Sequence, residues 1–484
     1  MTIKMPDTPS TRSVWLCRSG AIVLSLVVSA CASPIHQAGE LPQTRVPNAW
    51  NAITAQSAAT MNLANWWQRF NDPVLTQLVA QALQSNTDVR AAQAALKQAR
   101  ALRDGKAAGL RPSVNAAASA QRSQPGSSDA TSTFQAGFDA SWEPDIFGGQ
   151  RSALGAAESD AMAAQSSLAQ VQVSMAAEVA VTYIDLRGLQ ARLAIARRNL
   201  AAQTETLQIA RWRAQAGLAS SLDVEQAVAA SEQTAAQIPT LASNLAQDQS
   251  SLAVLTGQAP GALNTLLQAN ADGKPAIPQA PDSMALAIPA ETLRQRPDVR
   301  AAEYRVQAAL DRVNQADAAR YPSFQISGSL GLRALTLGAL TDGASVLRNL
   351  LAGVSVPLLD GGAARAQVQA QEAALEQTRV AYEATVLTAL KDVEDALVSL
   401  QSDQERLQRL KTAATAAANA DLLASQRYAS GLIDFRTVLE TQRTLLSTQD
   451  SVQATQANLS ADYVRLYKAL GGGWLPESET ATPP

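Results

Sequence analysis

The fold is decided by residues 149–216, which read GQRSALGAAESDAMAAQSSLAQVQVSMAAEVAVTYIDLRGLQARLAIARRNLAAQTETLQIARWRAQA. The stretch contains no proline, and its only glycines after Gly149 are Gly155 and Gly188. As one helix it would be roughly 100 Å long at 1.5 Å per residue, far longer than a helix of a globular domain. Apolar residues recur in it every seven positions, as in a coiled coil: Val179, Leu186, Leu193, Leu200 and Leu207.

A second rod of the same character covers residues 363–429, where Val386, Val393, Leu400, Leu407 and Ala414 are again seven apart. Short motifs recur as well, since residues 88–92 and 298–302 both read DVRAA. Near the end of each rod an arginine precedes a Gly-Leu pair, first Arg213 with Gly217-Leu218 and then Arg427 with Gly431-Leu432. The sequence therefore predicts a tandem duplication.

Each half also contains a region of period two before its rod. Strands are expected at about 112–124 and 131–143 in the first half, and at about 322–334 and 346–358 in the second. Alternation over about ten residues suits strands with one face to lipid and the other to water. Because four strands cannot close without unpaired backbone groups, two or three copies are expected to share one barrel. The alternative is a soluble four-stranded sheet at the end of a helical rod.

The remaining segments complete a fold that is mainly α-helical with a small β part. The first repeat, 66–257, is expected to hold a helix from Val74 to about Ala108 and another at 222–255, after the rod. A connector at 258–290 leads to the second repeat, 291–472, which ends in a helix at 435–470 before a tail at 473–484. Ser221 and Asp434 are expected to cap the helices that follow the two rods. The short helices of each half are expected to lie beside its rod.

The first 30 residues have the pattern of a secretory signal, with basic residues, an apolar run and small residues before a cysteine. Residues 28–31, Val-Ser-Ala-Cys, resemble a bacterial lipobox, which implies that Cys31 becomes the lipidated first residue of a leader at 31–65. The following Ala32-Ser33, without an aspartate, suggests sorting to the outer membrane by resemblance to other lipoproteins. An ordinary signal peptide with an incidental cysteine is the alternative.

Composition argues against catalysis and nucleic-acid binding. The single histidine, His36, lies in the leader, so neither a histidine-based triad nor a histidine metal cluster is expected. Glycine pairs lack the residues that would make a phosphate loop. Without residues 1–30, 36 basic residues face 41 acidic ones, a formal charge of −5. We therefore expect no catalytic residue, metal or cofactor, apart from the lipid on Cys31.

Taken together, several stretches resemble the TolC-like outer-membrane factors, in their NodT-type, OprM-like lipoprotein branch. They are residues 66–78, both DVRAA motifs, 142–149 (WEPDIFGG), 356–362 (VPLLDGG), 427–431 (RYASG) and 466–474 (LYKALGGGW). The resemblance implies a homotrimer whose twelve strands form one outer-membrane barrel above a periplasmic helical tunnel. It also implies a periplasmic adaptor protein and an inner-membrane pump of the resistance-nodulation-division class as partners.

The resemblance further implies a gate at the tip of the helices, held shut at an Arg-Tyr position and ringed by carboxylates. Arg427 and Tyr428 match that position, whereas the first repeat has Trp212-Arg213 there. Asp223 and Asp434 are the candidate carboxylates, although Ile433 fills the position expected to be acidic. Whether Arg427 and Tyr428 form a gate or only pack at the surface stays open. It also stays open whether Asp434 belongs to the gate or only caps a helix. The turns at Gly217, Leu218, Gly431 and Leu432 are expected to dock the adaptor.

The function expected from these observations is that of a passive outer-membrane exit duct of a tripartite efflux system. A duct for type I protein secretion is one alternative, and the neighbouring genes would distinguish the two. A structural lipoprotein that spaces the outer membrane from other layers is an alternative of a different class.

Overall fold

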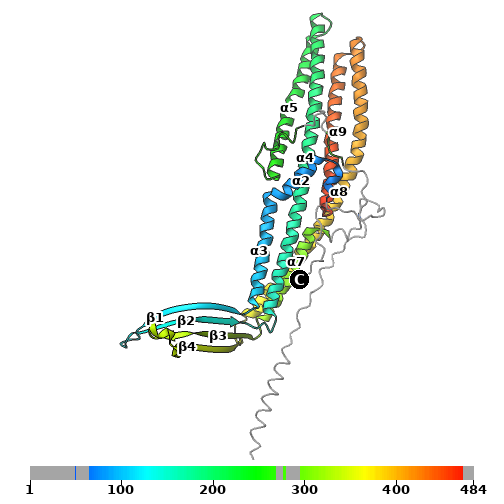
Figure 1. The fold of residues 1–484 in the computed structure, drawn as a ribbon. Helices are drawn as coiled ribbons and strands as arrows, with labels where there is room; N and C mark the ends of the chain where they lie inside the picture. The colour runs from blue at the N-terminus through cyan, green and yellow to red at the C-terminus, as the bar shows by residue number, and fades with distance from the viewer. Residues whose placement is uncertain (1–49, 51–64, 269–275, 280–294, 473–484) are drawn as a thin grey trace, which may run out of the picture. The chain divides into compact units, whose positions relative to one another are not determined.

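A computed structural model of the 484-residue chain describes residue 50 and residues 65–268, 276–279 and 295–472. Cys31, the signal peptide, most of the leader and the tail lie outside the described residues. The helices are a 3₁₀ turn (Trp66–Phe70), α2 (Pro73–Ser85), α3 (Thr87–Gly109), α4 (Gly149–Gln215), α5 (Ser221–Leu255), α7 (Pro297–Ala318), α8 (Ala363–Ala429) and α9 (Phe435–Ala469) (Figure 1). The strands are β1 (Ser113–Ser123), β2 (Thr131–Trp142), β3 (Ser323–Ala334) and β4 (Val346–Ser355). Two 3₁₀ turns, Gly338–Thr341 and Gly343–Ser345, lie between β3 and β4.

The two rods are the long helices α4 and α8, each of 67 residues. Most of the residues at seven-residue spacing are buried along their lengths, whereas Leu200 and Ala414 are half-buried. Gly188 shows how closely α4 approaches α9, because a Cβ there would lie 2.8 Å from the Cβ of Ala457. The seams therefore pack helix on helix with small residues at the closest points.

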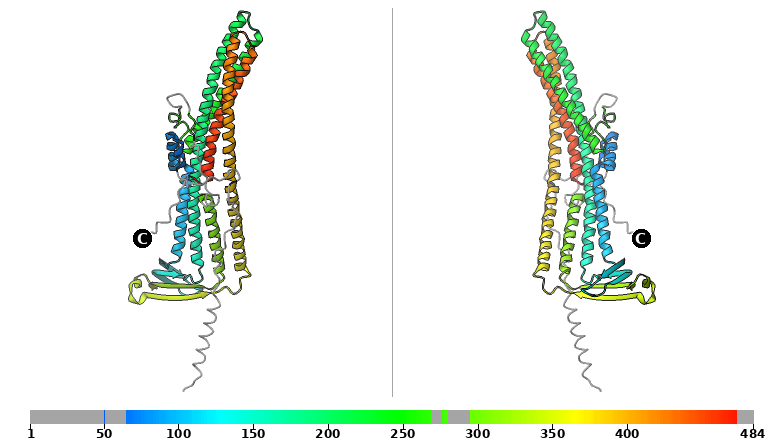
Figure 2. Two further views of the ribbon diagram at one scale, coloured as in Figure 1. Left: turned by 90° about the vertical axis from the view of Figure 1, so that its right-hand side faces the viewer. Right: turned by 90° about the vertical axis from the view of Figure 1, so that its left-hand side faces the viewer.

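The short helices lie beside the long ones. Helix α4 packs against α3, α5, α7 and α9, and α8 packs against α7 and α9 (Figure 2). In the described part of the chain α3 and α8 are the outer helices of the row α3–α4–α7–α8. Among the described residues, no helix combines the length and apolar composition needed to cross a membrane.

The helix expected from Val74 to about Ala108 is wrong, because it is broken into α2 and α3 at Asn86. The Oδ1 atom of Asn86 accepts hydrogen bonds from the backbone N–H groups of Asp88 and Val89, so it caps α3. Its Nδ2 donates to the carbonyl of Leu255, 2.9 Å away at the end of α5. A contact 169 residues distant thus stabilises a break that helical periodicity does not reveal.

Two further expectations are corrected locally. The cap of α5 is Ser220 and not Ser221, because Asp223 accepts from the Ser220 backbone while the Ser220 hydroxyl accepts from the Asp223 N–H. Strand β4 ends at Ser355 and not near 358. Pro357, which has no N–H to donate to a strand neighbour, follows two residues later.

The four strands form one antiparallel sheet in the order β1-β2-β3-β4. Its register places the alternating apolar residues on one face, since Phe138 of β2 lies opposite Ala116 of β1 and Leu330 of β3. That face is open in the single chain, where Phe138 is 59% and Leu350 81% exposed. The other face carries mostly polar and small residues: Ser119, Gln135, Gly137, Asp139, Ser329, Gly331 and Arg333. Strand β4 is the exception, because it places Leu347 and Leu351 on the polar face and Arg348 on the apolar one.

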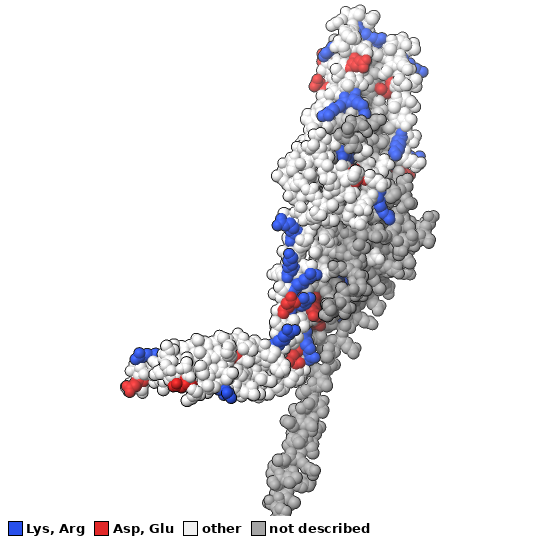
Figure 3. Space-filling model, viewed as in Figure 1, with Lys and Arg blue, Asp and Glu red and all other residues white. Residues whose placement is uncertain are grey.

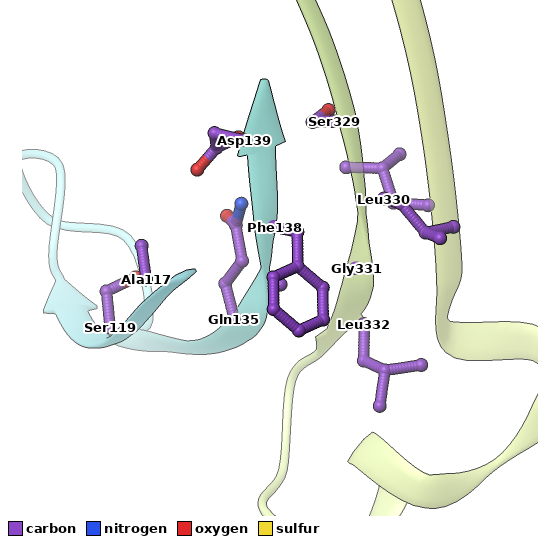
Figure 4. Close-up of a pocket in the computed structure, with 11 residues that line it drawn as sticks. Ala117, Ser119, Gln135, Phe138, Asp139, Ser329, Leu330, Gly331 and Leu332 are labelled. Atoms are coloured by element: carbon purple, nitrogen blue, oxygen red, sulfur yellow. The ribbon is translucent and has the colours of Figure 1, made fainter. Parts of the chain in front are cut away.

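The centre of the sheet has a close contact between two glycines. Gly137 and Gly331 face each other across β2 and β3, and a Cβ on Gly137 would lie 2.7 Å from the Gly331 Cα. Around them lies a pocket of about 40 Å³ that includes Gln135, Asp139 and Ser329 (Figure 4). These glycines allow the two halves of the chain to join through adjacent strands.

The main core lies where the amino-terminal helices meet the middle of the rods. Trp66 is fully buried and stacks on Tyr467 with ring centres 5.3 Å apart. Leu75 and Leu78 of α2, Ile184 of α4 and Leu466 of α9 belong to the same cluster. The start of the first repeat is thereby anchored on the last helix of the second.

Candidate functional site at the ends of the long helices

The two long helices end in turns of the same geometry. After α4, the N–H of Gly217 donates to the carbonyl of Ala214 and that of Leu218 to the carbonyl of Arg213. After α8, Gly431 and Leu432 repeat both bonds to the carbonyls of Tyr428 and Arg427. Gly217 has a φ of 74° and Gly431 a φ of 73°, a conformation that favours glycine. Both repeats therefore turn by the Schellman motif.

The turns expose apolar side chains. Leu218 is 77% and Leu432 73% exposed, and Trp212 and Leu222 are also largely exposed. The same Schellman bonds hold the backbone of both leucines. The turns expected from the sequence to dock the adaptor thus present two equivalent, exposed leucines.

Arg213 and Tyr428 come together at the tip. The guanidinium of Arg213 donates to the carbonyls of Tyr428 and Ala429, over 3.2 and 3.3 Å. It thereby binds the carbonyl-rich end of α8, where a cation is favourable. The contact joins the first repeat to the second at the ends of their rods.

Tyr428 also packs inward. Its ring centre lies 5.3 Å from that of Phe435, the first residue of α9. Phe435 is buried in a small cluster with Leu207, Ala210 and Ala227. The tyrosine therefore has a packing role inside one chain, in addition to the role expected in a gate.

Arg427 is exposed, and its side chain makes no hydrogen bond or ion pair with the described part of the chain. The structure thus separates two neighbours that the sequence motif grouped, since Tyr428 is bound within the chain and Arg427 is free for a contact outside it.

The two aspartates cap helices. Asp434 accepts hydrogen bonds from the backbone N–H and the hydroxyl of Thr437, and these bonds lower the pKa of its carboxyl group. Asp223 accepts from the backbone N–H and the hydroxyl of Ser220, over 3.0 and 2.9 Å. Both carboxylates are exposed or half-buried beside the turns, so capping leaves them at the tip.

A buried polar network in the middle of the rods was not predicted. Arg187 of α4 is 3% exposed, and its guanidinium donates to the Tyr183 hydroxyl, to Gln190 and to the carbonyl of Gln268. Tyr183 donates in turn to Asp72, the cap of α2, over 2.9 Å. Burial raises the pKa of Tyr183, so its hydroxyl stays protonated. The sequence signal that could have revealed this network is the pair Tyr183 and Arg187, which are four residues apart on the helix beside a heptad leucine.

A pair of carboxyl groups lies near the same level. Burial, and secondly the negative charge of Asp185 on α4, raise the pKa of Asp248 on α5 to about 6. Burial also raises the pKa of Asp185, against the effect of Arg465. In the described part of the chain, no group of three His, Cys, Asp or Glu residues is arranged to hold a metal ion.

Comparisons with known proteins match both halves of the chain. The sequence matches the family described as "Outer membrane efflux protein" over residues 78–258 and 288–472. It is 31% identical over 471 residues to a Pseudomonas putida protein named probable efflux pump outer membrane protein SepC, covering 94% of this chain and 96% of that protein. Nodulation protein T of Rhizobium leguminosarum biovar viciae is 29% identical over 462 residues, covering 94% of each.

The fold is also similar to a solved structure. The outer-membrane channel OprN superimposes with a TM-score of 0.83 at 33% sequence identity. The match covers 90% of this chain and 100% of that one.

Proposed function

Because the chain belongs to the outer membrane efflux protein family, we propose that it is the exit duct of a tripartite efflux system in the outer membrane. Small molecules pass through it from an inner-membrane pump to the outside. The duct performs no chemistry and needs no cofactor, because the pump supplies the energy. The only covalent group in this proposal is the lipid on Cys31.

One observation supports this function most directly: the sheet with one apolar and one polar face continues into two helices of 67 residues. An open face that is mainly apolar suits lipid, and a mainly polar face suits a water-filled lumen. The helices are roughly 100 Å long at 1.5 Å per residue, enough to extend well beyond a bilayer. If the sheet were a soluble cap, large apolar side chains such as Leu350 and Phe138 would not be expected to be exposed.

Three copies complete the wall. Strands β1 and β4 are the free edges of the sheet, and unpaired edges are not tolerated in lipid. Three chains supply twelve strands to one outer-membrane barrel, and their helices form a tunnel in the periplasm. The turns at Leu218 and Leu432 then lie at the periplasmic end, where a periplasmic adaptor docks and connects the duct to a pump of the resistance-nodulation-division class.

The same end forms the gate. Arg213 and Tyr428 hold the two rods of one chain together, and Arg427 is available to a neighbouring copy. Asp223 and Asp434 cap their helices and place carboxylates beside the turns. Opening requires the rods to separate at these contacts.

Deletion of the gene tests the duct. The deleted strain is expected to become more sensitive to dyes, detergents and antibiotics, and a plasmid copy to restore resistance. The purified protein should conduct ions in planar bilayers, whereas a spacer lipoprotein would give no conductance. Unchanged sensitivity together with absent conductance would overturn the proposal, and neighbouring genes for an ATP-driven exporter would favour type I secretion.

A further inference from the structure

The described chain has two free edges, and each is built from one helix and one strand. One edge consists of α3 followed by β1, and the other of β4 followed by α8. Helix α3 packs on α4, and α8 packs on α7, each by one side. The opposite sides of both helices are exposed in the single chain.

Inside the chain the duplication already joins the counterpart edges. Strand β2 pairs with β3, and α4, which follows β2, packs on α7, which precedes β3. In the duplicated arrangement β4 corresponds to β2, β1 to β3, α8 to α4 and α3 to α7. Pairing of β4 with β1 of a second copy would therefore bring α8 alongside α3 of that copy, antiparallel.

The exposed faces suit such a contact sterically. On α3, the face opposite the buried Val89 and Leu96 carries mostly small exposed residues: Ala91, Ala94, Gln98, Ala101 and Gly105. On α8, the face opposite the buried Leu375 and Val386 carries Ala366, Ala373, Val380, Ala384 and Leu387. Small side chains allow two helices to approach closely, as Gly188 and Ala457 do between α4 and α9.

Beside these faces run charges of opposite sign. Helix α3 carries Arg90 and Lys97, and α8 carries Glu376 and Glu383, all exposed. Within α8, Glu376 also lies 3.9 Å from Arg379, one turn along the helix, a distance near the limit of an ion pair. At 100° per residue, each pair lies about a quarter turn from the buried face of its helix. Because the two helices would run antiparallel, both pairs fall on the same side of the wall. Lysine and arginine side chains are visible along the α3 side of the molecule (Figure 3).

The next basic residue of α3 is directed into its own chain. Arg100 lies closer to the buried face of α3, and its guanidinium donates to Gln165 of α4 over 3.4 Å. Arg90 and Lys97 are therefore the cations of α3 on the side of the wall that also carries Glu376 and Glu383.

The charges also match in height above the sheet. Lys97 lies twelve residues before Gly109, the end of α3, and Glu376 lies thirteen residues after Ala363, the start of α8. At 1.5 Å per residue both are roughly 18–20 Å from the sheet end of their helix. Arg90 and Glu383 lie nineteen and twenty residues from those ends. Each basic side chain thus has an acidic one within about one residue of its own level.

The α4–α7 contact, which corresponds inside the chain to the α8–α3 contact between copies, contains an ion pair of the same kind. Arg312 of α7 binds Asp160 of α4, with both side chains partly exposed. A basic residue on the helix before a strand thus already binds an acidic residue on the helix after the neighbouring strand.

We propose that the α3 and α8 edges of neighbouring copies bind each other through two ion pairs, Lys97 with Glu376 and Arg90 with Glu383. These pairs set the register in which copies assemble. The inference rests on the proposed function, because only chains that share one wall bring these edges together.

Charge reversal tests the two pairs. One variant combines Arg90→Glu and Lys97→Glu, and a second combines Glu376→Lys and Glu383→Lys. Each is expected to lower the fraction of detergent-solubilised trimer about tenfold at the midpoint temperature of the wild type, because attraction becomes repulsion at two sites in every interface. The chain with all four substitutions is expected to recover the wild-type fraction.

A matched control reverses two exposed arginines of α4 that lie away from both edges, Arg197 and Arg198. This control should leave the trimer unchanged. Circular dichroism of each variant shows whether the chain itself has folded, so that a loss of trimer is assigned to the edges.

The outcomes separate the ion pairs from the duct. A wild-type chain that never forms an oligomer in membranes would overturn both. A stable wild-type trimer that tolerates either double reversal, or a chain with all four substitutions that stays dissociated, would overturn the ion pairs and leave the duct standing.

Discussion

The guanidinium carbon of Arg213 lies 4.4 Å from the ring centre of Tyr428, so the last turn of one long helix holds the last turn of the other. The two residues belong to different repeats and are 215 positions apart. Their contact is the only one between the candidate gate residues in the described part of the chain that joins the two rods directly.

Removing this contact should open the tip. A cation–π contact of this kind contributes on the order of 1 kcal/mol, roughly fivefold in the ratio of closed to open states. Arg213→Ala is therefore expected to increase vancomycin entry and the open time in planar bilayers about fivefold. Tyr428→Phe, which keeps the ring, serves as the matched control and should leave entry unchanged. If vancomycin entry and open time in the Arg213→Ala variant equal those of the wild type, this contact is not part of the gate.

The glycine pair in the sheet should be intolerant of side chains. Gly137→Ala and Gly331→Ala each place a Cβ within about 2.7 Å of backbone atoms of the neighbouring strand, so β2 and β3 must separate. We expect at least a fivefold loss of assembled protein in the outer membrane, measured on heated and unheated gels, for a cost of about 1–3 kcal/mol. Gly353→Ala on β4 is the control, because no atom lies within 4 Å of its Cβ position. Equal amounts of all three variants would contradict the prediction.

The Arg187 network should stabilise the middle of the molecule. Arg187→Met removes a buried cation that donates to three acceptors and leaves Gln190 and the Gln268 carbonyl without a donor. Such a loss costs about 2–3 kcal/mol, which lowers the melting temperature by several degrees. Thermal unfolding followed by circular dichroism measures the change. Arg192→Met, which removes a half-exposed ion pair with Asp450, should lower the melting temperature less. A larger loss for Arg192→Met than for Arg187→Met would argue against the network.

The free energy of unfolding should depend on pH through Asp248. Its pKa rises from 3.8 to about 6, chiefly through burial. The folded chain thus binds more protons than the unfolded one between these values, and its stability falls as the pH rises through them. Asp248→Asn should weaken this dependence, of which the raised pKa of Asp185 leaves a part, and raise the stability at pH 7 by about 1 kcal/mol, because the half-exposed carboxylate is partly screened by solvent.

The control for this prediction is Glu232→Gln, an exposed substitution on the same helix. Melting temperatures measured at about pH 5 and pH 7, on either side of the raised pKa, compare both variants. If the wild type and Asp248→Asn lose the same stability between the two pH values, Asp248 is not the group responsible.

Periodicity explains which parts of the fold were predictable. The rods and strands were found because Val179 and Leu186, or Phe134 and Phe138, repeat with the period of the element that buries or aligns them. The break at Asn86 was not predicted because the Asn86 side chain donates a hydrogen bond to the carbonyl of Leu255, which is far away in sequence. The mainly helical fold class and the family expected from the motifs are confirmed.

The candidate site was predictable to a lesser degree. Sequence position placed Arg213, Arg427 and Tyr428 near the turns, but only the side-chain contact between the ends of α4 and α8 shows that Arg213, and not Arg427, binds the Tyr428 carbonyl. Local spacing could not decide this, because Arg213 and Arg427 occupy equivalent places in the two repeats. The gating roles themselves stay predictions.

The pairing of β2 with β3 inside one chain has a consequence for how fast the wall is built. Joining two halves by a continuous backbone gives them an effective local concentration that separate molecules rarely reach. Half of the contacts around the wall then form within single chains at a rate independent of expression level, and three contacts between copies, not six between separate halves, complete the ring. Only the contacts between copies, α3 with α8 and β1 with β4, respond to the amount of protein in the membrane.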